Sequence, residues 1–160
     1  MKVVISGSFR KSLVEIIELK EQLESKGIEV LNPKSKTTIY NNDNPEFVLF
    51  SGEKNEDANE LERKYLESIA SSDAHIVYVT NGYLGETAFS EMLFACNLGI
   101  PVYLTEQIES LYCSDKPQSI GLFKSIEMLI TNRSIKIGIS NLLSDYNFGG
   151  RQLKLKKDDN

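Results

Sequence analysis

Short apolar segments alternate with amphipathic segments through the first two thirds of the chain. Runs rich in β-branched residues predict strands at Lys2–Ser6, Ile28–Leu31, Ala74–Val79 and Pro101–Leu104. Apolar residues at helical spacing predict intervening helices over about residues 13–23, 56–72 and 86–97. Strands that alternate with helices form right-handed βαβ units. We therefore expect an α/β fold with one doubly wound parallel sheet of about five strands, of the flavodoxin or Rossmann type, covered by helices on both faces.

Two stretches do not follow this alternation. Residues 34–59 are polar and rich in Asn, Ser and Lys, so we expect a long loop in which the apolar patch Phe47–Phe50 can form one edge strand. Beyond it, the pattern predicts a helix over Gln118–Thr131 and leaves Ile135–Leu143 unassigned. We predict one domain over residues 1–150, followed by a flexible charged tail over residues 151–160.

Composition narrows the class of protein. Hydrophobic residues make up 41% of the 160 positions, yet no apolar run approaches the roughly 20 residues of a membrane span. The first residues lack the apolar region of a secretory signal, so we expect a cytoplasmic protein. The net charge of −5 argues against binding of nucleic acid, which favours a basic surface. Cys96, Cys113 and His75 lack metal-ligand spacing, so we expect neither a metal nor a cofactor.

The first candidate binding segment is the turn after the first predicted strand, with the residues Gly7, Ser8, Phe9 and Arg10. Small residues let backbone amides approach an anion, Ser8 adds a hydroxyl, and Arg10 adds a fixed positive charge. Because the turn follows a strand and opens a helix, it should lie beyond the carboxyl ends of the strands, where α/β sheets bind ligands. We expect phosphate or sugar oxygens as its partners; an ordinary tight turn with an exposed arginine is the alternative.

The second candidate segment follows the third predicted strand and opens the next helix. It contains Gly82, Tyr83, Gly85, Glu86 and Thr87. We expect the Thr87 hydroxyl to cap the helix, and the Glu86 carboxylate to complement the helix dipole or to contact substrate. By the same topological argument, this segment should share the crevice with the first turn.

Glu91 lies on the otherwise apolar helix that the second segment opens, on the face of Thr87. A carboxylate near a glycine-containing loop can act as a nucleophile toward an electrophilic carbon. A solvated glutamate near the positive end of the helix dipole is the alternative. We interpret His75 as a core or edge histidine with satisfied hydrogen bonds and Tyr65 as a core residue, and we assign neither to the site.

These segments resemble the nucleoside 2-deoxyribosyltransferase-like superfamily, which includes the deoxynucleoside monophosphate N-glycosidases. The resemblance covers about Lys2 to Glu106 and rests on the segments SGSFR, ASSDAHIVYV and NGYLGETAFSEMLFACNLGIPVYL. The last segment is similar to an uncharacterised bacterial and phage branch of the superfamily. The resemblance implies the fold expected above, and a small-molecule nucleoside or nucleotide as the ligand.

The resemblance also implies roles for particular residues. Glu91 would attack the anomeric carbon of the sugar, and the turn over residues 7–10 would hold the sugar or a 5′-phosphate. Tyr83 and Glu86 would approach the substrate from the second segment. Members of the superfamily assemble as dimers or larger oligomers and often complete the site with a neighbour's residues, so we expect a homo-oligomer here.

Two departures from the superfamily pattern leave the activity open. The stretch between Thr80 and Glu91 is longer than in the monophosphate glycosidases. Tyr65 stands where those enzymes carry an aspartate that helps to protonate the leaving base. The sequence is therefore compatible with cleavage or transfer of an N-glycosidic bond, and with nucleotide binding without catalysis. A lysine-decarboxylase-like phosphoribohydrolase is disfavoured, because the paired glycines and the flanking arginine of that family are missing.

Overall fold

A computed structural model describes residues 1–36, 38–39, 48–51, 53, 58–113, 116–117 and 135–146. The elements of the main layers are β1 (Lys2–Gly7), α1 (Phe9–Ser25), β2 (Glu29–Asn32), α2 (Ala58–Ala70), β5 (Ala74–Tyr78), α3 (Glu86–Asn97), β7 (Val102–Leu104) and β10 (Ile135–Ile137). A helix over residues 139–146 follows β10. The short peripheral strands are β3 (Thr38–Ile39), β4 (Leu49–Phe50), β6 (Tyr83–Gly85), β8 (Ser110–Cys113) and β9 (Lys116–Pro117).

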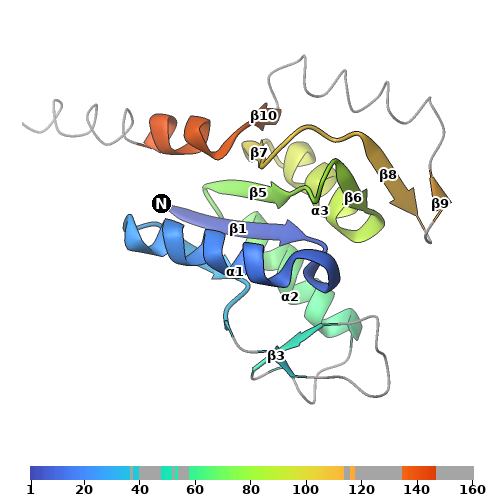
Figure 1. Ribbon diagram of the computed structural model, residues 1–160. Coiled ribbons are helices and arrows are strands. Elements are labelled where there is room, and N and C mark those ends of the chain that lie inside the picture. The colour runs from blue at the N-terminus through green and yellow to red at the C-terminus, as the bar shows by residue number, and fades with distance from the viewer. Residues whose placement is uncertain are drawn as a thin grey trace, which may run out of the picture.

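The main sheet has five strands in the order β10-β7-β5-β1-β2 (Figure 1). Every neighbouring pair is parallel, which confirms the predicted doubly wound α/β fold. From β1 the chain first adds β2 on one side and then, after α2, adds β5 on the other side. Sheets of this order bind ligands outside the carboxyl ends of the strands at which the order reverses. In this chain those strands are β1 and β5.

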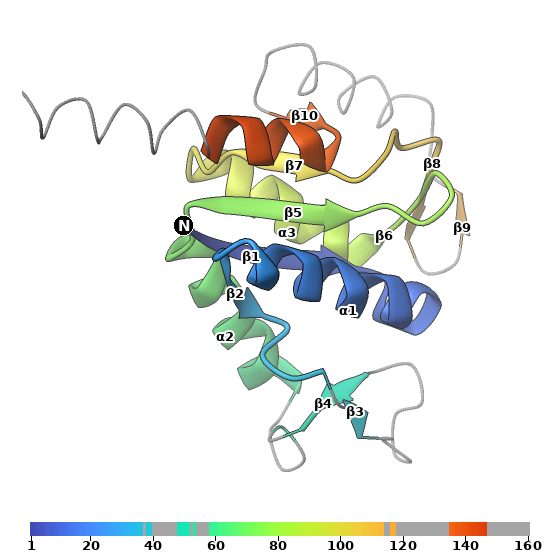
Figure 2. The same cartoon turned by 60° about the vertical axis from the view of Figure 1, so that its left-hand side comes forward.

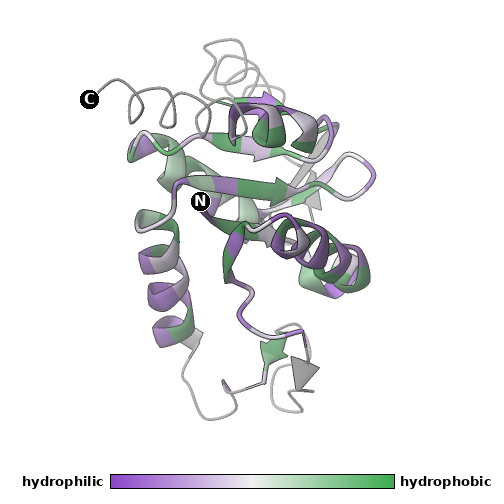
Figure 3. Cartoon of the chain, turned by 90° about the vertical axis from the view of Figure 1, so that its left-hand side faces the viewer, coloured by the Kyte–Doolittle hydropathy of each residue, from purple (hydrophilic) through white to green (hydrophobic). Residues whose placement is uncertain are grey.

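The central strands are buried on both faces, as their continuous apolar sequence predicts. Val3 and Ile5 pack with Ile16 in the layer of α1, whereas Val4 packs with Met92 in the layer of α3. Figure 2 shows α1 in front of the sheet and α3 behind it. Figure 3 shows hydrophobic residues gathered in the strands, with hydrophilic residues on the outward side of α2. Alternation along β1 therefore sends successive side chains into different helical layers.

The peripheral segments correct several sequence-based expectations. In the described parts of residues 34–59, β3 and β4 pair with each other in a separate antiparallel ribbon and not with the main sheet. The expected turn after β5 contains β6, which pairs with β8. Strands of two or three residues are too short to show a period, so pattern analysis could not find them.

The end of the described chain supplies the fifth strand of the sheet. β10 pairs with β7, and Leu142 of the following helix packs in the same core layer as α1. The segment left unassigned from its sequence, Ile135–Leu143, is thus a strand followed by a helix. The helix predicted over Gln118–Thr131 and the tail predicted over residues 151–160 lie outside the described residues.

Gly7 allows β1 to approach β5 closely. A Cβ atom at position 7 would lie 2.9 Å from Tyr78 Cβ and 3.0 Å from the Tyr78 carbonyl oxygen. Since backbone cannot move aside cheaply, we expect Gly7→Ala to lower the free energy of unfolding by about 1–3 kcal/mol in a urea titration. Gly27→Asn is the control, because a Cβ there meets no atom within 4 Å and Asn tolerates the positive φ. Equal losses in the two variants would contradict this explanation.

Candidate functional site

The turn after β1 lies at the carboxyl edge of the sheet, where the strand order reverses. Ser8 precedes α1 without a side-chain capping bond, and its carbonyl oxygen accepts hydrogen bonds of 2.9 Å from the amides of Lys11 and Ser12. The backbone at Ser12 is not helical (φ −136°, ψ 38°). The Ser12 hydroxyl lies 2.7 Å from the hydroxyl of Thr80, which follows β5. The first turn of α1 is therefore distinct from the rest of the helix and is held against the end of β5.

Residues 80–83 form a tight hairpin turn. The backbone groups of Thr80 and Tyr83 exchange hydrogen bonds of 3.0 and 2.9 Å. Between them, Asn81 and Gly82 have positive φ angles of 49° and 75°. This is the geometry of a type I′ turn, for which Asn-Gly is the preferred pair. The Gly82 amide also donates to Glu106 Oε1 at 2.8 Å, so the turn is fixed from outside as well.

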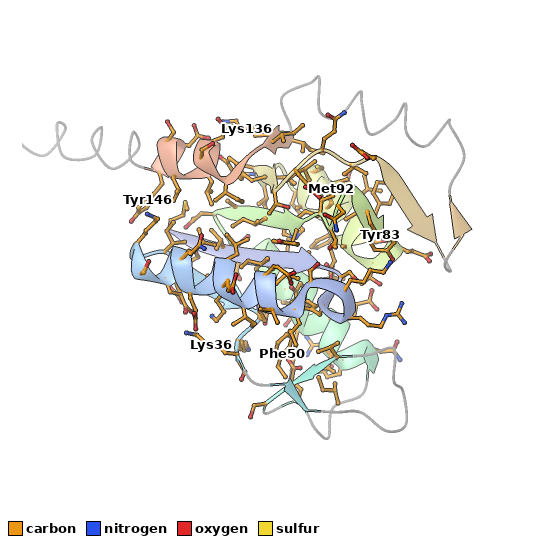
Figure 4. The ribbon with its side chains drawn as sticks, viewed as in Figure 1. Lys36, Phe50, Tyr83, Met92, Lys136 and Tyr146 are labelled. Atoms are coloured by element: carbon orange, nitrogen blue, oxygen red, sulfur yellow. The ribbon has the colours of Figure 1, made fainter. Side chains whose placement is uncertain are left out.

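Lys11, the residue that follows the first candidate segment, contacts Tyr83 of the second. The Lys11 ammonium lies 3.7 Å from the centroid of the Tyr83 ring, in cation–π geometry. A Cβ atom at Gly85 would lie 3.3 Å from the Tyr83 hydroxyl oxygen, so this glycine gives the phenol room. Figure 4 shows Tyr83 at the end of the sheet toward which β1 and β5 run. With Arg10 exposed beside Lys11, the shared edge carries two adjacent cations.

Phe9 connects the same edge to the long segment between β2 and α2. Its ring meets the ring of Phe50 edge to face, with centroids 5.2 Å apart and an interplanar angle of 83°. Glu53 Oε2 accepts a hydrogen bond of 2.7 Å from the Phe50 amide. Figure 4 places Phe50 between α1 and the β3–β4 ribbon. The apolar patch expected within the long loop therefore packs against the start of α1.

The structure tests the expected positions of Thr87 and Glu86 at the start of α3. The N-cap residue is Gly85, with no side-chain capping bond, and Thr87 is exposed. The predicted Thr87 cap is wrong, because Thr87 is already the second residue of the helix, and capping requires the residue before the first turn. Glu86 lies exposed in that first turn, where its charge complements the helix dipole.

Glu91 is buried, and the alternative of a solvated glutamate is wrong. The residue is 8% exposed and lies among the buried residues Ala88, Met92 and Ala95 of α3. Burial raises the pKa of its carboxyl group to about 7, and the nearby Glu62 carboxylate adds to the rise. A hydrogen bond with the Ser6 side chain acts in the opposite direction and lowers this pKa. The carboxyl group therefore changes its charge close to neutral pH.

A buried polar cluster surrounds Glu91, and sequence reasoning missed it. Ser6 and His75 are both fully buried, and Ser6 Oγ lies 2.6 Å from His75 Nε2. Tyr65 donates its hydroxyl proton to the carbonyl oxygen of Ile5, and the charge of Glu91 helps to raise the pKa of the phenol, after burial as the main cause. Strand alternation could have indicated part of this cluster. Ser6 lies two positions after Val4 on β1, so its side chain faces the same layer of α3.

His75 is only partly satisfied, which corrects the sequence interpretation. Burial lowers the pKa of its imidazole to about 3, so the ring is neutral at physiological pH. Nε2 has Ser6 as a partner, whereas Nδ1 is buried without a hydrogen-bond partner in the described part of the chain. Buried polar atoms of this kind are rare, and each one calls for an explanation.

Comparison with known proteins gives a fold but no family match. No family model matches the chain, and no curated protein matches it. A CMP N-glycosidase of Clostridium botulinum, BcmB, is similar in structure with a TM-score of 0.53, 15% identity, and 86% of each chain covered. The chain has the fold of this protein. A conserved protein from Enterococcus faecalis V583 is also similar, with a TM-score of 0.50, 17% identity, and coverage of 89% of this chain and 84% of that chain.

At 15% and 17% identity, these likenesses show a shared fold. The fold places residues 7–10 and 82–91 at one edge of the sheet, with Lys11 touching Tyr83 and Ser6 beside Glu91. Within the described ranges, no group of three or more His, Cys, Asp or Glu side chains could hold a metal ion. In the same ranges, no helix is long and apolar enough to cross a membrane.

The charge of Glu91 should make stability depend on pH. Its folded pKa of about 7 lies above the ordinary value of 4.5, so the folded protein holds the proton more tightly than the unfolded chain. Stability is therefore lost as the pH rises from about 4.5 through 7, by a total of about 3 kcal/mol. Glutamine cannot ionise, so Glu91→Gln should be more stable than the wild type by about 3 kcal/mol at pH 8 and by less than about 1 kcal/mol at pH 5.

Urea unfolding of both proteins at the two pH values measures this difference. Glu67→Gln is the control, because Glu67 is exposed on the outer side of α2 and its replacement should give a difference that hardly changes with pH. A pH-independent difference for Glu91→Gln would show that the carboxyl group is not withdrawn from water in solution.

Proposed function

We propose that this protein cleaves the N-glycosidic bond of a nucleoside or nucleoside 5′-monophosphate, with Glu91 as the nucleophile. The observation that carries the proposal is the position and burial of this carboxyl group. Among the described residues, Glu91 is the one buried carboxylate, and it lies beside β1, next to the point where the strand order reverses. A carboxylate that is withdrawn from water and fixed in place suits attack on a carbon that develops positive charge.

The proposed reaction proceeds through a covalent intermediate. A carboxylate oxygen of Glu91 forms a bond to the anomeric carbon, while the bond from that carbon to the base nitrogen breaks. The base leaves with the electron pair of the broken bond and takes up a proton. Water, or a second base, then attacks the same carbon and regenerates the carboxylate. The ionised form is required for the first step, so the proposal predicts turnover that rises with pH up to about 7.

The amino-terminal end of α1 suits the other end of such a substrate. The side chains of Ser8, Arg10 and Lys11 offer donors and positive charge to a phosphate. The Tyr83 ring, held by Lys11, lies beside them. The CMP N-glycosidase that shares the fold supports a nucleoside monophosphate as the first substrate class to test.

One observation favours nucleotide binding without catalysis as a second candidate. The resemblance places Tyr65 where the N-glycosidases carry an acid for the leaving base. In this structure the Tyr65 hydroxyl donates to the Ile5 carbonyl, and burial raises the pKa of the phenol well above 10. A phenol in this state is a poor proton donor to a leaving group. A nucleotide sensor would use the same edge of the sheet without breaking the bond.

Incubation with a panel of nucleosides and 5′-monophosphates, followed by chromatography of the free base, separates the two candidates. Base release by the wild type and none by Glu91→Gln supports cleavage by this carboxylate. A second free base added to the mixture distinguishes transfer from hydrolysis, because only transfer yields a new nucleoside. A rise in melting temperature with one ligand, without any release, would support the sensor instead.

A further inference from the structure

The segment that follows β7 holds the turn over residues 80–83 from outside. It begins at Thr105, directly after β7, and includes Glu106 and Glu109. The Gly82 amide donates to Glu106 Oε1 at 2.8 Å, and the Gly82 carbonyl oxygen accepts from the Glu109 amide at 2.8 Å. Both backbone polar groups of the buried Gly82 are therefore bonded to this one segment. The proposed chemistry has not used this arrangement.

Thr105 continues the connection between β7 and β5 beyond the end of the strand. Its amide donates to the Val77 carbonyl oxygen at 3.1 Å, and its hydroxyl oxygen accepts from the Val79 amide at 2.9 Å. The last residue of β7 that pairs with β5 is Leu104. After it, side-chain oxygens replace backbone carbonyl groups as acceptors for the amides of Val79 and Gly82. The turn thus stays bonded to this chain segment after the parallel pairing has ended.

The same segment also packs on the turn and pairs with the strand that follows it. A Cβ atom at Gly82 would lie 2.8 Å from Glu109 Cβ and 2.9 Å from Glu109 Cγ. Immediately beyond the turn, β6 pairs with β8, with Tyr83 opposite Ser110 (Figure 1). The turn and the first residue of β6 therefore lie against residues 105–113.

These contacts are more than the shape of the turn requires. Asn81-Gly82 is the preferred pair for a type I′ turn, and the backbone bonds between Thr80 and Tyr83 already close it. The bond from Gly82 to Glu106 therefore fixes where the turn lies rather than which turn it is. Tyr83 is the next residue, and a cation–π contact requires the cation to stay within about 6 Å of the ring.

We propose that Glu106 is a positioning residue for Tyr83: its carboxylate holds the Gly82 amide and thereby keeps the Tyr83 ring against Lys11. A carboxylate suits this role because it binds an amide more strongly than a neutral oxygen does. This inference rests on the proposed function only in assigning the edge with Lys11 and Tyr83 to the substrate. The hydrogen bond and the ring contact need no substrate.

The Lys11 side chain gives a direct test by NMR. An aromatic ring moves the resonances of protons above its face to lower frequency, so the protons on Lys11 Cε report the Tyr83 ring. Tyr83→Leu defines the signal without the ring. We expect Glu106→Ala to lose most of the difference between the wild type and Tyr83→Leu. Glu106→Gln should keep most of it, because the amide oxygen still accepts from Gly82.

The control for this measurement is Gln107→Ala, which shortens the next exposed side chain and leaves the Glu106–Gly82 bond in place. It should give the Lys11 signal of the wild type. Glu106 is itself exposed, so we expect Glu106→Ala to fold. An unchanged Lys11 signal in Glu106→Ala, or an equal loss in Glu106→Gln, would overturn the proposal.

Kinetics with a substrate that the wild type cleaves provide an independent measurement. Glu106→Ala should raise KM by about tenfold and change kcat by less than about twofold, because it loosens groups that bind and leaves Glu91 in place. Glu106→Gln should restore KM. A fall in kcat at unchanged KM would contradict a role in placing Tyr83 for binding. The Lys11 signal needs no turnover, so the absence of glycosidic activity would sink the proposed function and leave this inference standing.

Discussion

Glu91→Gln is expected to reduce kcat/KM for N-glycosidic cleavage by about 10³-fold or more, while the protein stays folded. The amide fills nearly the same volume in the layer of α3 but cannot form the bond to the anomeric carbon. Glu91→Asp keeps the charge and withdraws it by about one methylene group. Since misplacement of a reacting atom by about 1 Å costs on the order of 10²-fold, we expect an intermediate loss for this variant.

The control for these variants is Glu29→Gln, which removes an exposed carboxylate at the start of β2, the opposite end of the sheet. It should keep full activity. In the wild type, kcat/KM should fall about tenfold for each pH unit below about 7, because only the ionised Glu91 reacts. Activity that survives in Glu91→Gln, or a profile without an acidic limb, would remove Glu91 from the role of nucleophile.

Acidification is expected to destabilise the folded chain through His75. Burial lowers the pKa of this imidazole from 6.5 to about 3. Because the unfolded chain takes up the proton first as the pH falls, the stabilisation present above pH 6.5 is lost progressively toward pH 3. The full loss is about 5 kcal/mol, of which about 3 kcal/mol falls between pH 7 and pH 4.

His75→Gln tests this expectation, because glutamine does not titrate. Urea unfolding at pH 7, 5.5 and 4 should show the stability of the wild type relative to this variant falling by about 3 kcal/mol over the range. Glu91→Gln provides a comparison of opposite sign, since the Glu91 contribution is gained as the pH falls. The wild type should therefore change less with pH than either variant. A constant difference between wild type and His75→Gln would mean that the imidazole is accessible to protons when folded.

The two titrations come from one structural cause. His75 and Glu91 are both withdrawn from water in the layer between the central strands and α3, and burial disfavours the charged form of each. For a base this lowers the pKa, and for an acid it raises the pKa. Because its pKa is raised by burial, the Glu91 carboxylate lowers the stability of the folded chain at neutral pH.

Much of the fold could be predicted because its signals are local. The central strands are short apolar runs, and the helices between them have apolar residues at helical spacing, so neighbouring residues were sufficient evidence. The Asn81-Gly82 pair likewise encodes its own turn. By contrast, β10 has three residues and joins the sheet only through its pairing with β7, which no local pattern shows.

The candidate site was predictable in outline, because the end of a parallel strand must lie at the carboxyl edge of the sheet. That rule placed Gly7 and Gly82 correctly at one edge and left the partners of each residue unknown. Lys11 on Tyr83 and Phe9 on Phe50 join residues more than 40 positions apart. Contacts between residues so distant in the sequence depend on the tertiary fold, so local sequence patterns could not predict them.

The amino-acid sequence by itself therefore determined the parallel sheet, its helical layers and the position of residues 7–10 and 82–87 at the carboxyl edge, since each follows from periodicity within a few residues. Only the tertiary structure decided that Glu91 is buried, that Ser6 lies beside both Glu91 and His75, and that Thr87 remains exposed. The physical reason is that desolvation and hydrogen bonding depend on all atoms within a few ångströms. In this chain, those atoms come from strands and helices that are far apart along the sequence.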